Sequence, residues 1–192
     1  FIGILAFVKN TQVGVWFRDL MCSSDYLILL LEFVILIGLK QSDLLLGSQL
    51  DSSIVIRPGI SVGERSFLKL MANFRKQQPD MSLAVEYGKR MTLSKHGALG
   101  IAARHSRTTN DAASAAIAYM STRAELFTVH RERDSESRRL YVDLAVENSA
   151  DAYFLILAYL TSIELIISQM LSYPDDIKPR IELPLRPDTC QV

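Results

Sequence analysis

A serine flanked by two glycines is the first feature whose residue types and spacing could support chemistry. The run Gly59-Ile60-Ser61-Val62-Gly63 matches G-x-S-x-G, the nucleophile elbow of α/β hydrolases. That elbow needs a strand before the serine, a helix after it, and an acid and a histidine later in the chain. Pro58 argues against a central strand at this point, and the chain lacks the repeated strand–helix units of that fold. A small serine hydrolase using Ser61 is therefore kept only as an alternative.

A structural role for the same serine, as the cap of a helix, accounts for the whole motif. Ser61 followed by Glu64 is a capping box, in which the serine side chain accepts from the first turn of a helix and the glutamate reaches back. We therefore predict an amphipathic helix from Val62 to Gln77. Its apolar face consists of residues at helical spacing, namely Phe67, Leu70, Met71 and Phe74.

The histidines and cysteines do not form a metal-binding or redox pattern. His96, His105 and His130 lack the H-x-x-x-H and H-E-x-x-H spacings of metal sites. Cys22 and Cys190 lie near opposite ends of the chain, which is no disulfide framework and no ligand spacing. Phosphate-loop and dinucleotide fingerprints are absent as well. We predict no metal, no cofactor and no enzymatic activity.

The charge balance argues against direct binding of nucleic acid. The 192 residues include 21 basic and 21 acidic side chains, so the formal net charge is zero, whereas nucleic-acid-binding domains show a basic excess or stripe. The one dense basic run, Arg131 to Arg139, is interleaved with acidic residues. We interpret this run as a solvated hairpin turn.

Two apolar stretches are too short to cross a membrane. Leu27 to Leu39 and Tyr153 to Ile167 each contain a glutamate, Glu32 and Glu164, and a spanning helix needs about 20 apolar residues. We predict buried helices and no membrane association. Because Tyr26 to Gly38 is apolar on nearly every face, we expect it to be covered by other helices or by a partner subunit.

The remaining periodicities predict helices followed by a hairpin and a long helix. Further helices are expected over Ser82–Met91, over Lys95–His105, and from a cap at Thr109 or Asn110 to about Thr122. Two alternating strands, Glu125 to Arg131 and Arg138 to Val146, should form a hairpin with its turn at Glu132 to Ser137.

The order of these elements predicts an α+β domain. A cap at Asn148 or Ser149 should open a helix to about Ser172, and Lys178 to Leu185 should form an edge strand because it contains two prolines. We expect an N-terminal helical bundle packed on a small antiparallel sheet with a long C-terminal helix. Residues 1–25 could be an extra strand or helix or a leader, and residues 26–192 are expected to form the domain.

Several segments, taken in order, carry a resemblance to a known family. They are Leu45-Leu46-Gly47-Ser48-Gln49-Leu50-Asp51, Ile60-Ser61 with Phe67-Leu68-Lys69-Leu70, Met81-Ser82-Leu83-Ala84-Val85-Glu86-Tyr87-Gly88, Gly97-Ala98-Leu99-Gly100-Ile101-Ala102, and Thr108 through Tyr119. Over residues 27 to 185 the chain resembles the N-terminal effector-sensing domain, of the arabinose-binding type, of AraC-family transcription regulators.

This resemblance implies a cytoplasmic bacterial regulator whose N-terminal domain binds a small-molecule effector, mediates self-association as a homodimer, or does both. A separate C-terminal domain with a pair of helix-turn-helix motifs would contact DNA. Only Arg186 to Val192 follow the matching region, so we expect that DNA-binding domain to be absent from this chain. The family transfers no effector signature residue by residue.

For a sensor domain of this kind we expect a mainly apolar pocket between sheet and helices. The candidate ligand-binding residues are His96, Tyr119, Tyr141 and Tyr153. The polar stripe Thr161, Glu164 and Ser168 on the long helix faces solvent, a polar cavity or a dimer seam. A ligand-free oligomerisation domain stays as an alternative because of the apolar helix near the N-terminus.

Overall fold

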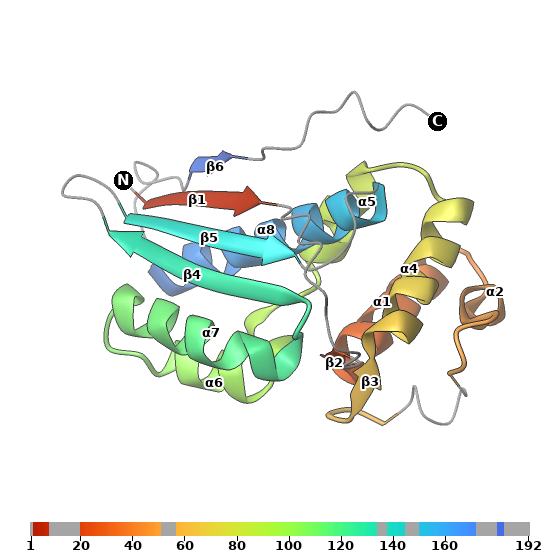
Figure 1. The fold of residues 1–192 in the computed structure, drawn as a ribbon, viewed down its shortest axis with the longest axis horizontal. Helices are drawn as coiled ribbons and strands as arrows, with labels where there is room; N and C mark the ends of the chain where they lie inside the picture. Colours follow the sequence, from red (N-terminus) through yellow and green to blue (C-terminus); the bar gives the residue numbers. More distant parts are fainter. Residues whose placement is uncertain are drawn as a thin grey trace, which may run out of the picture.

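Two groups of helices and strands lie side by side in the fold (Figure 1). The computed structural model describes residues 2–7, 20–50, 57–133, 138–144, 150–171 and 180–182. The first group, which we call the helical unit, comprises α1 (Ser24–Leu36), α2 (Gln41–Leu45) and α4 (Glu64–Gln77). The second, the sheet unit, is a four-stranded sheet with α6 (Ala98–Arg104), α7 (Thr109–Arg123) and α8 (Ala150–Leu171). The helix α5 (Ser82–Gly88) lies between the two units.

The main sheet has the strand order β4-β5-β1-β6. The predicted hairpin is confirmed: β4 (Phe127–Arg133) runs antiparallel to β5 (Arg138–Leu144), with Val129 opposite Val142. The expected C-terminal edge strand is also present as β6 (Arg180–Glu182).

The N-terminal segment completes this sheet. Of the alternatives left open for the first residues, a strand is found: β1 (Ile2–Phe7) lies between β5 and β6 and is parallel to both. The antiparallel arrangement that we expected is therefore limited to β4–β5 and to the separate pair β2 (Met21–Ser23) and β3 (Ser61–Gly63). Parallel pairing of β1 could not be anticipated, because it joins residues more than a hundred positions apart.

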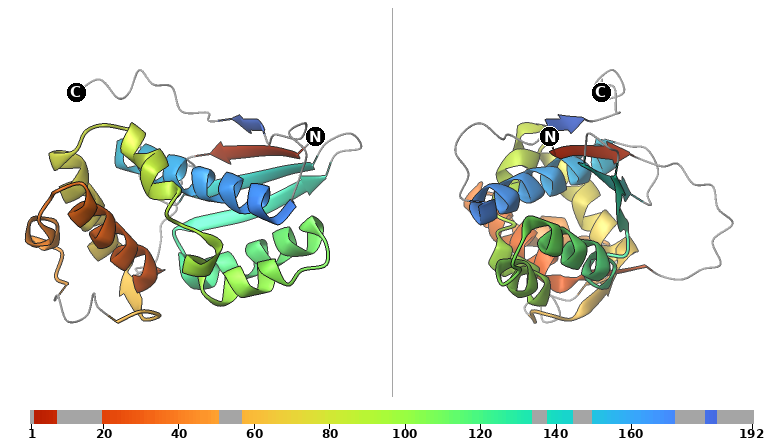
Figure 2. Two further views of the ribbon diagram at one scale, coloured as in Figure 1. Left: turned by 180° about the vertical axis from the view of Figure 1, so that it is seen from behind. Right: turned by 90° about the vertical axis from the view of Figure 1, so that its left-hand side faces the viewer.

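The described helices cover one face of the sheet and not the other. The helices α7 and α8 lie on the same side of it (Figure 2). Val142 and Leu144 of β5 are buried, while the alternate residues Tyr141 and Asp143 are only half-buried. Because successive side chains of a strand point to opposite faces, Tyr141 and Asp143 lie on the face away from these helices.

The long helix α8 contacts both units. An aromatic cluster packs its Phe154 against Phe74 of α4 and Tyr87 of α5, with ring centroids 5.4 and 6.4 Å apart. Gly88 allows α5 to approach α8 closely, since a Cβ atom there would lie 2.3 Å from the carbonyl oxygen of Ala158. Tyr87 and Gly88 are both buried, and α8 fixes the position of α5.

The predicted capping box at the start of α4 is wrong. Ser61 pairs with Ser23 in the β2–β3 ladder, so its backbone is extended two residues before the helix. The N-cap is Gly63, which offers no side-chain oxygen to the first turn. The apolar face of the helix is as predicted, with Phe67, Leu70, Met71 and Phe74 all buried.

The helix predicted over Lys95–His105 is interrupted. Gly97 has φ 60° and ψ −133°, which separates the short 3₁₀ helix η1 (Leu93–His96) from α6. A positive φ is readily adopted only by glycine. The next cap is also one residue earlier than predicted, because the Thr108 side chain accepts from the backbone N–H of Asp111 at 3.1 Å.

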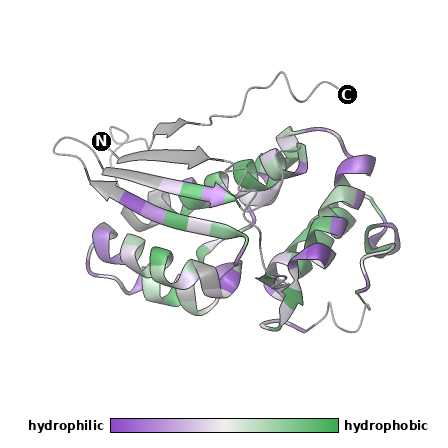
Figure 3. Ribbon diagram, in the orientation of Figure 1, coloured by the Kyte–Doolittle hydropathy of each residue, from purple (hydrophilic) through white to green (hydrophobic). Residues whose placement is uncertain are grey.

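Most of the apolar surface of α1 is covered within the chain itself. Figure 3 shows hydrophobic residues along α1 and α8. Ile35 and Leu36 are the exception, with exposed fractions of 58% and 62%. Among the described residues, no helix is both long enough and apolar enough to traverse a lipid bilayer. The extended piece expected at Ile54–Ile56 and the cap expected at Asn148 or Ser149 lie outside the described residues.

Candidate functional site

The short strand β2 connects the two units. On one side it pairs with β3, and on the other Cys22 forms a bridge to Ala124, the residue after α7. The backbone N–H of Glu125 donates to the Met21 carbonyl at 2.9 Å, and the Met21 N–H donates to the Glu125 carboxylate at 2.8 Å. Segments about a hundred residues apart in sequence therefore meet at this junction.

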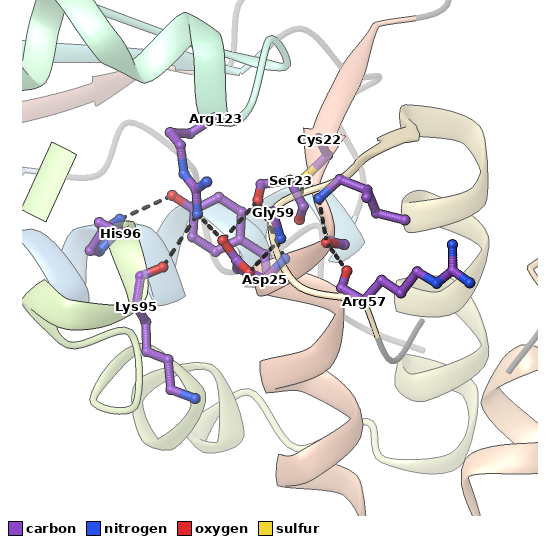
Figure 4. A network of polar contacts seen from close by, with 11 residues as sticks. Cys22, Ser23, Asp25, Arg57, Gly59, Lys95, His96 and Arg123 are labelled. Carbon is purple, nitrogen blue, oxygen red and sulfur yellow. Dashed lines mark hydrogen bonds and ion pairs between the residues drawn. The ribbon is translucent and has the colours of Figure 1, made fainter. Parts of the chain in front are cut away.

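Directly after β2, the carboxylate of Asp25 gathers donors from three segments (Figure 4). It accepts from the guanidinium of Arg123 at the end of α7, from the Gly59 N–H at 3.0 Å, and from the Ser23 hydroxyl at 3.2 Å. Burial acts to raise the pKa of Asp25, but the hydrogen bonds and positive charge of Arg123 outweigh it and hold that pKa below its usual value. The carboxylate is thus ionised and joins the two units.

Arg123 also contacts the next residue of α1. Its guanidinium carbon lies 5.6 Å from the ring centroid of Tyr26, within the range of a cation–π contact. One Nη donates to the Lys95 carbonyl at 3.4 Å, as Figure 4 shows. The side chains of Arg123 and Asp25 are 15% and 19% exposed, so solvent screens this ion pair less than a surface pair.

A chain of hydrogen bonds leads from Tyr26 into the interior. The Tyr26 hydroxyl lies 3.0 Å from Nδ1 of His96, and His96 Nε2 lies 3.2 Å from the Met91 carbonyl and 3.1 Å from the Ser162 hydroxyl. The Ser162 hydroxyl donates to the same carbonyl at 2.8 Å. Since a carbonyl only accepts, we assign the proton to Nε2, and the Tyr26 hydroxyl donates to Nδ1.

The surroundings keep His96 uncharged near neutral pH. Burial, together with the positive charge of Arg123, lowers its pKa to about 4, although the bond to the Met91 carbonyl acts in the opposite direction. Burial likewise raises the pKa of the Cys22 thiol to about 12, so Cys22 is unreactive in the folded protein. The junction therefore combines one paired charge with neutral polar groups.

A small cavity lies against this network. Its volume is about 20 Å³. It lies between the units, since its wall includes residues of β2, α1 and α4 as well as of α7, β4 and α8. The lining residues are almost wholly apolar at the cavity surface: Cys22, Tyr26, Phe67, Met91, Met120, Phe127, Leu155 and Tyr159.

Comparison with protein families identifies the chain. A family described as the arabinose-binding domain of AraC transcription regulators, N-terminal, matches residues 38–188. The chain belongs to this family. No curated protein matches the chain.

The four residues predicted to bind an effector lie on four different elements of this AraC-type domain. His96 of η1 is buried in the network described above. Tyr119 of α7 is 53% exposed, and Tyr141 of β5 stacks on His130 with ring centroids 5.0 Å apart. Tyr153 of α8 is half-buried. None of the four lines the cavity, and His96 is hydrogen-bonded to two of the lining residues, Tyr26 and Met91.

The geometry around Ser61 offers no partner for a nucleophile. Ser61 is exposed at the start of β3, whereas the hydrogen bonds of His96 go to Tyr26, Met91 and Ser162. Within the part of the chain that is described, no group of three or more metal-ligating side chains is present. Neither observation supports hydrolysis or metal chemistry at this serine.

Sequence reasoning did not identify the residues that build the junction. Asp25 and Arg123 carry no motif, and they meet only because β2 positions both segments. The contact of Tyr159 with Phe127, at 4.5 Å between ring centroids, likewise depends on the fold.

Proposed function

We propose that this chain is an effector-sensing domain that binds a small molecule at the junction of the helical and sheet units. The observation that carries the proposal is the cavity bounded by both units. Ligand sites are typically concave, mainly apolar and equipped with a few oriented polar groups. Tyr26 and His96 supply such groups beside the cavity.

Ligand binding would act on the relative position of the units. The cavity is lined by side chains from both, so a ligand there contacts α1 and α4 on one side and α7 and α8 on the other. A ligand shifts a conformational equilibrium only through different affinities for the two states. If the spacing of the two units differs between two conformational states, a ligand that contacts both units binds these states with different affinities.

Membership of the family supports a proposal for the biological setting. The domain would control a separate helix-turn-helix domain that contacts DNA, act as a homodimer, and work in the cytoplasm of a bacterium, where the chromosome lies. The zero net charge of this chain supports DNA contact through another domain. Residues 26–192 would form this sensor, with β1 and β2 completing its sheets.

A thermal-shift screen tests the proposal. The panel contains sugars, amino acids, fatty acids and quorum-type signal molecules. A ligand at 100 times its dissociation constant adds about 2.7 kcal/mol, which for a chain of this size raises Tm by roughly 5–10 °C. A saturable rise with one class supports a sensor. The absence of any saturable rise across the panel would contradict it.

Self-association without a ligand is the second candidate function. The observation that favours it is the group of exposed apolar side chains at the end of α1 and after α2, namely Ile35, Leu36 and Leu46. Sedimentation velocity on the protein and on a Leu36→Lys variant tests this candidate. It predicts a dimer that dissociates in the variant, and a monomeric parent protein would contradict it.

Three of the residues predicted from the sequence remain proposals for ligand contact. Tyr119, Tyr141 and Tyr153 each have a direct test, because truncation to alanine lowers the affinity for the effector if the side chain touches it. Unchanged affinity in a variant removes that residue from the site. We propose His96 as a positioning residue, since it orients the hydroxyl of the cavity-lining Tyr26.

A further inference from the structure

We infer that the junction cavity takes a small, uncharged ring compound that is apolar over most of its surface and carries one hydrogen-bonding group. This inference rests on the proposed function, because it names the chemical class of the effector. It concerns only the wall of the cavity and the polar atoms beside it.

The wall consists mainly of aromatic rings and sulfur-containing side chains, with Leu155 as the one aliphatic residue in its lining. Tyr26, Phe67, Phe127 and Tyr159 supply rings, and Cys22, Met91 and Met120 supply sulfur. Rings pack favourably against other rings edge-on or offset, and thioether sulfur packs favourably against ring edges. A ring compound therefore matches this wall better than a flexible polar molecule.

A sugar does not match the same wall. Each hydroxyl taken out of water needs a new hydrogen-bond partner, and an unpaired buried polar group costs about 1–3 kcal/mol. The hydroxyl of Tyr26 is already bonded to His96, and the Ser162 hydroxyl and the Met91 carbonyl are bonded to each other. Too few free polar atoms remain for a polyol.

A charged ligand does not match it either. Burying an unpaired charge is far more costly than burying a neutral group. The cation beside the cavity-lining Tyr26 is Arg123, and its guanidinium already pairs with Asp25. An anionic ligand would have to break that pair and leave the Asp25 carboxylate without its counter-charge.

One polar atom of the wall residues has no hydrogen-bond partner among the described residues. Tyr159 is 6% exposed, and its hydroxyl forms no hydrogen bond with any other described residue, whereas the hydroxyls of the buried Tyr26 and Tyr87 both do. Buried tyrosine hydroxyls ordinarily have a partner. The hydrogen-bonding group of the ligand would supply the partner of Tyr159.

The two methionines allow the cavity to enlarge. A volume of about 20 Å³ is enough for a water molecule and not for a ring compound. Met91 and Met120 are buried in the wall, and methionine changes shape easily because its side chain has three rotatable bonds. The ligand would take the space that these two side chains vacate by changing rotamer.

Methyl NMR on protein labelled with ¹³C-methyl methionine tests the inference, with three probes of contrasting chemistry. The probes are indole, which is neutral with one N–H donor, L-arabinose, and sodium octanoate. Assignment uses single Met→Leu variants of the six methionines. We expect indole to shift the methyl signals of Met91 and Met120 saturably, because of its ring current, and to leave those of Met71 and Met81 unchanged.

The other outcomes are distinguishable. If L-arabinose or octanoate shifts the Met91 and Met120 signals and indole does not, the ligand class is wrong while the effector site stands. Saturable indole shifts confined to other methionines would overturn the location. If no probe shifts any signal and the thermal screen is also negative, both this inference and the proposed function fail.

A pair of tyrosine variants tests the hydrogen bond. Tyr159→Phe removes only the hydroxyl, so we expect the affinity for indole to fall about fivefold, the loss of one neutral hydrogen bond. Ser168→Ala is the control on the same helix because it removes an exposed hydroxyl far along α8, and its affinity should equal that of the parent protein. Equal affinities in both variants would remove Tyr159 from the site.

Discussion

Arg123 and Asp25 lie 98 residues apart in the sequence and form an ion pair that joins the end of α7 to the first turn of α1. The pair is mostly shielded from solvent, and both partners make further contacts at the junction. It therefore connects the two units at the point where we place the effector. The stability of the fold and the response to a ligand both depend on it.

Removal of the cation should destabilise the protein. In Arg123→Ala the Asp25 carboxylate keeps its buried position without a counter-charge, which we expect to lower the free energy of unfolding by about 2 kcal/mol. Urea denaturation monitored by circular dichroism measures the change. The control is Lys89→Ala, which removes an exposed pair with Glu86 and should change stability by less than about 0.5 kcal/mol. Equal effects of the two variants would show that the junction pair is no stronger than a surface pair.

The buried histidine should make stability depend on pH. The pKa of His96 is about 4 in the folded protein and 6.5 in the unfolded chain, so between these values the unfolded state binds more protons. Stability therefore decreases as pH falls from about 6.5 to 4, by at most about 3 kcal/mol from this group. Urea denaturation at several pH values should show this loss in the parent protein and a smaller loss in His96→Gln.

The control for that experiment is His105→Gln, because the His105 side chain is exposed and forms no ion pair with another described residue. We expect a smaller departure from the parent curve in this variant than in His96→Gln. Parallel curves for His96→Gln and the parent protein would mean that His96 is not the group responsible. Asp25 acts at lower pH, because its pKa is lower in the folded protein than in the unfolded chain. It stabilises the fold at pH values above its pKa in the unfolded chain, and this contribution is lost as the pH falls through its pKa in the folded protein.

Two glycines should respond in opposite directions to an added side chain. Gly88→Ala places a Cβ atom against the backbone of α8 and should destabilise the protein by roughly 2–3 kcal/mol, as overpacking does. Gly63→Ser supplies the missing cap of α4, has open space around it, and should stabilise by about 0.5 kcal/mol. Thermal denaturation of both variants checks the signs. A stabilised Gly88→Ala would contradict the close crossing of α5 and α8.

The thiol of Cys22 should report on opening of the junction. In a Cys190→Ser background Cys22 is the remaining cysteine, and its burial and raised pKa should make its reaction with Ellman's reagent at least about a hundredfold slower than that of a free thiol. Adding Arg123→Ala should accelerate the reaction, because the units then separate more easily. A fast reaction in the background protein would contradict burial of Cys22 at the junction.

Local patterns predicted most elements because each pattern reflects burial of one face. The spacing of Phe67, Leu70, Met71 and Phe74 placed α4 correctly, and strict alternation placed the β4–β5 hairpin. The cap at Ser61 was wrong because pairing with Ser23 holds it in a strand, a tertiary contact that a local motif does not contain. The break at Gly97 was missed since a glycine inside a helical pattern is compatible with either outcome.

The site was less predictable than the fold, for a physical reason. Its defining contacts join residues far apart in sequence, such as Tyr26 with His96 and Cys22 with Ala124. The ligand-binding residues were predicted from histidine and tyrosine side chains, and of the four chosen His96 lies at the junction. The cavity itself is lined mainly by apolar residues, which no sequence pattern distinguishes from ordinary core.

The most direct test of the account compares two isoleucine substitutions by isothermal titration calorimetry, using the ligand that stabilises the protein most in the thermal screen. Cys22→Ile adds volume inside the cavity, and Thr128→Ile adds the same side chain to the exposed side of another strand. Circular dichroism confirms that both variants are folded. We predict at least a tenfold loss of affinity in Cys22→Ile and parent affinity in Thr128→Ile. Parent affinity in a folded Cys22→Ile variant would contradict an effector site at the junction.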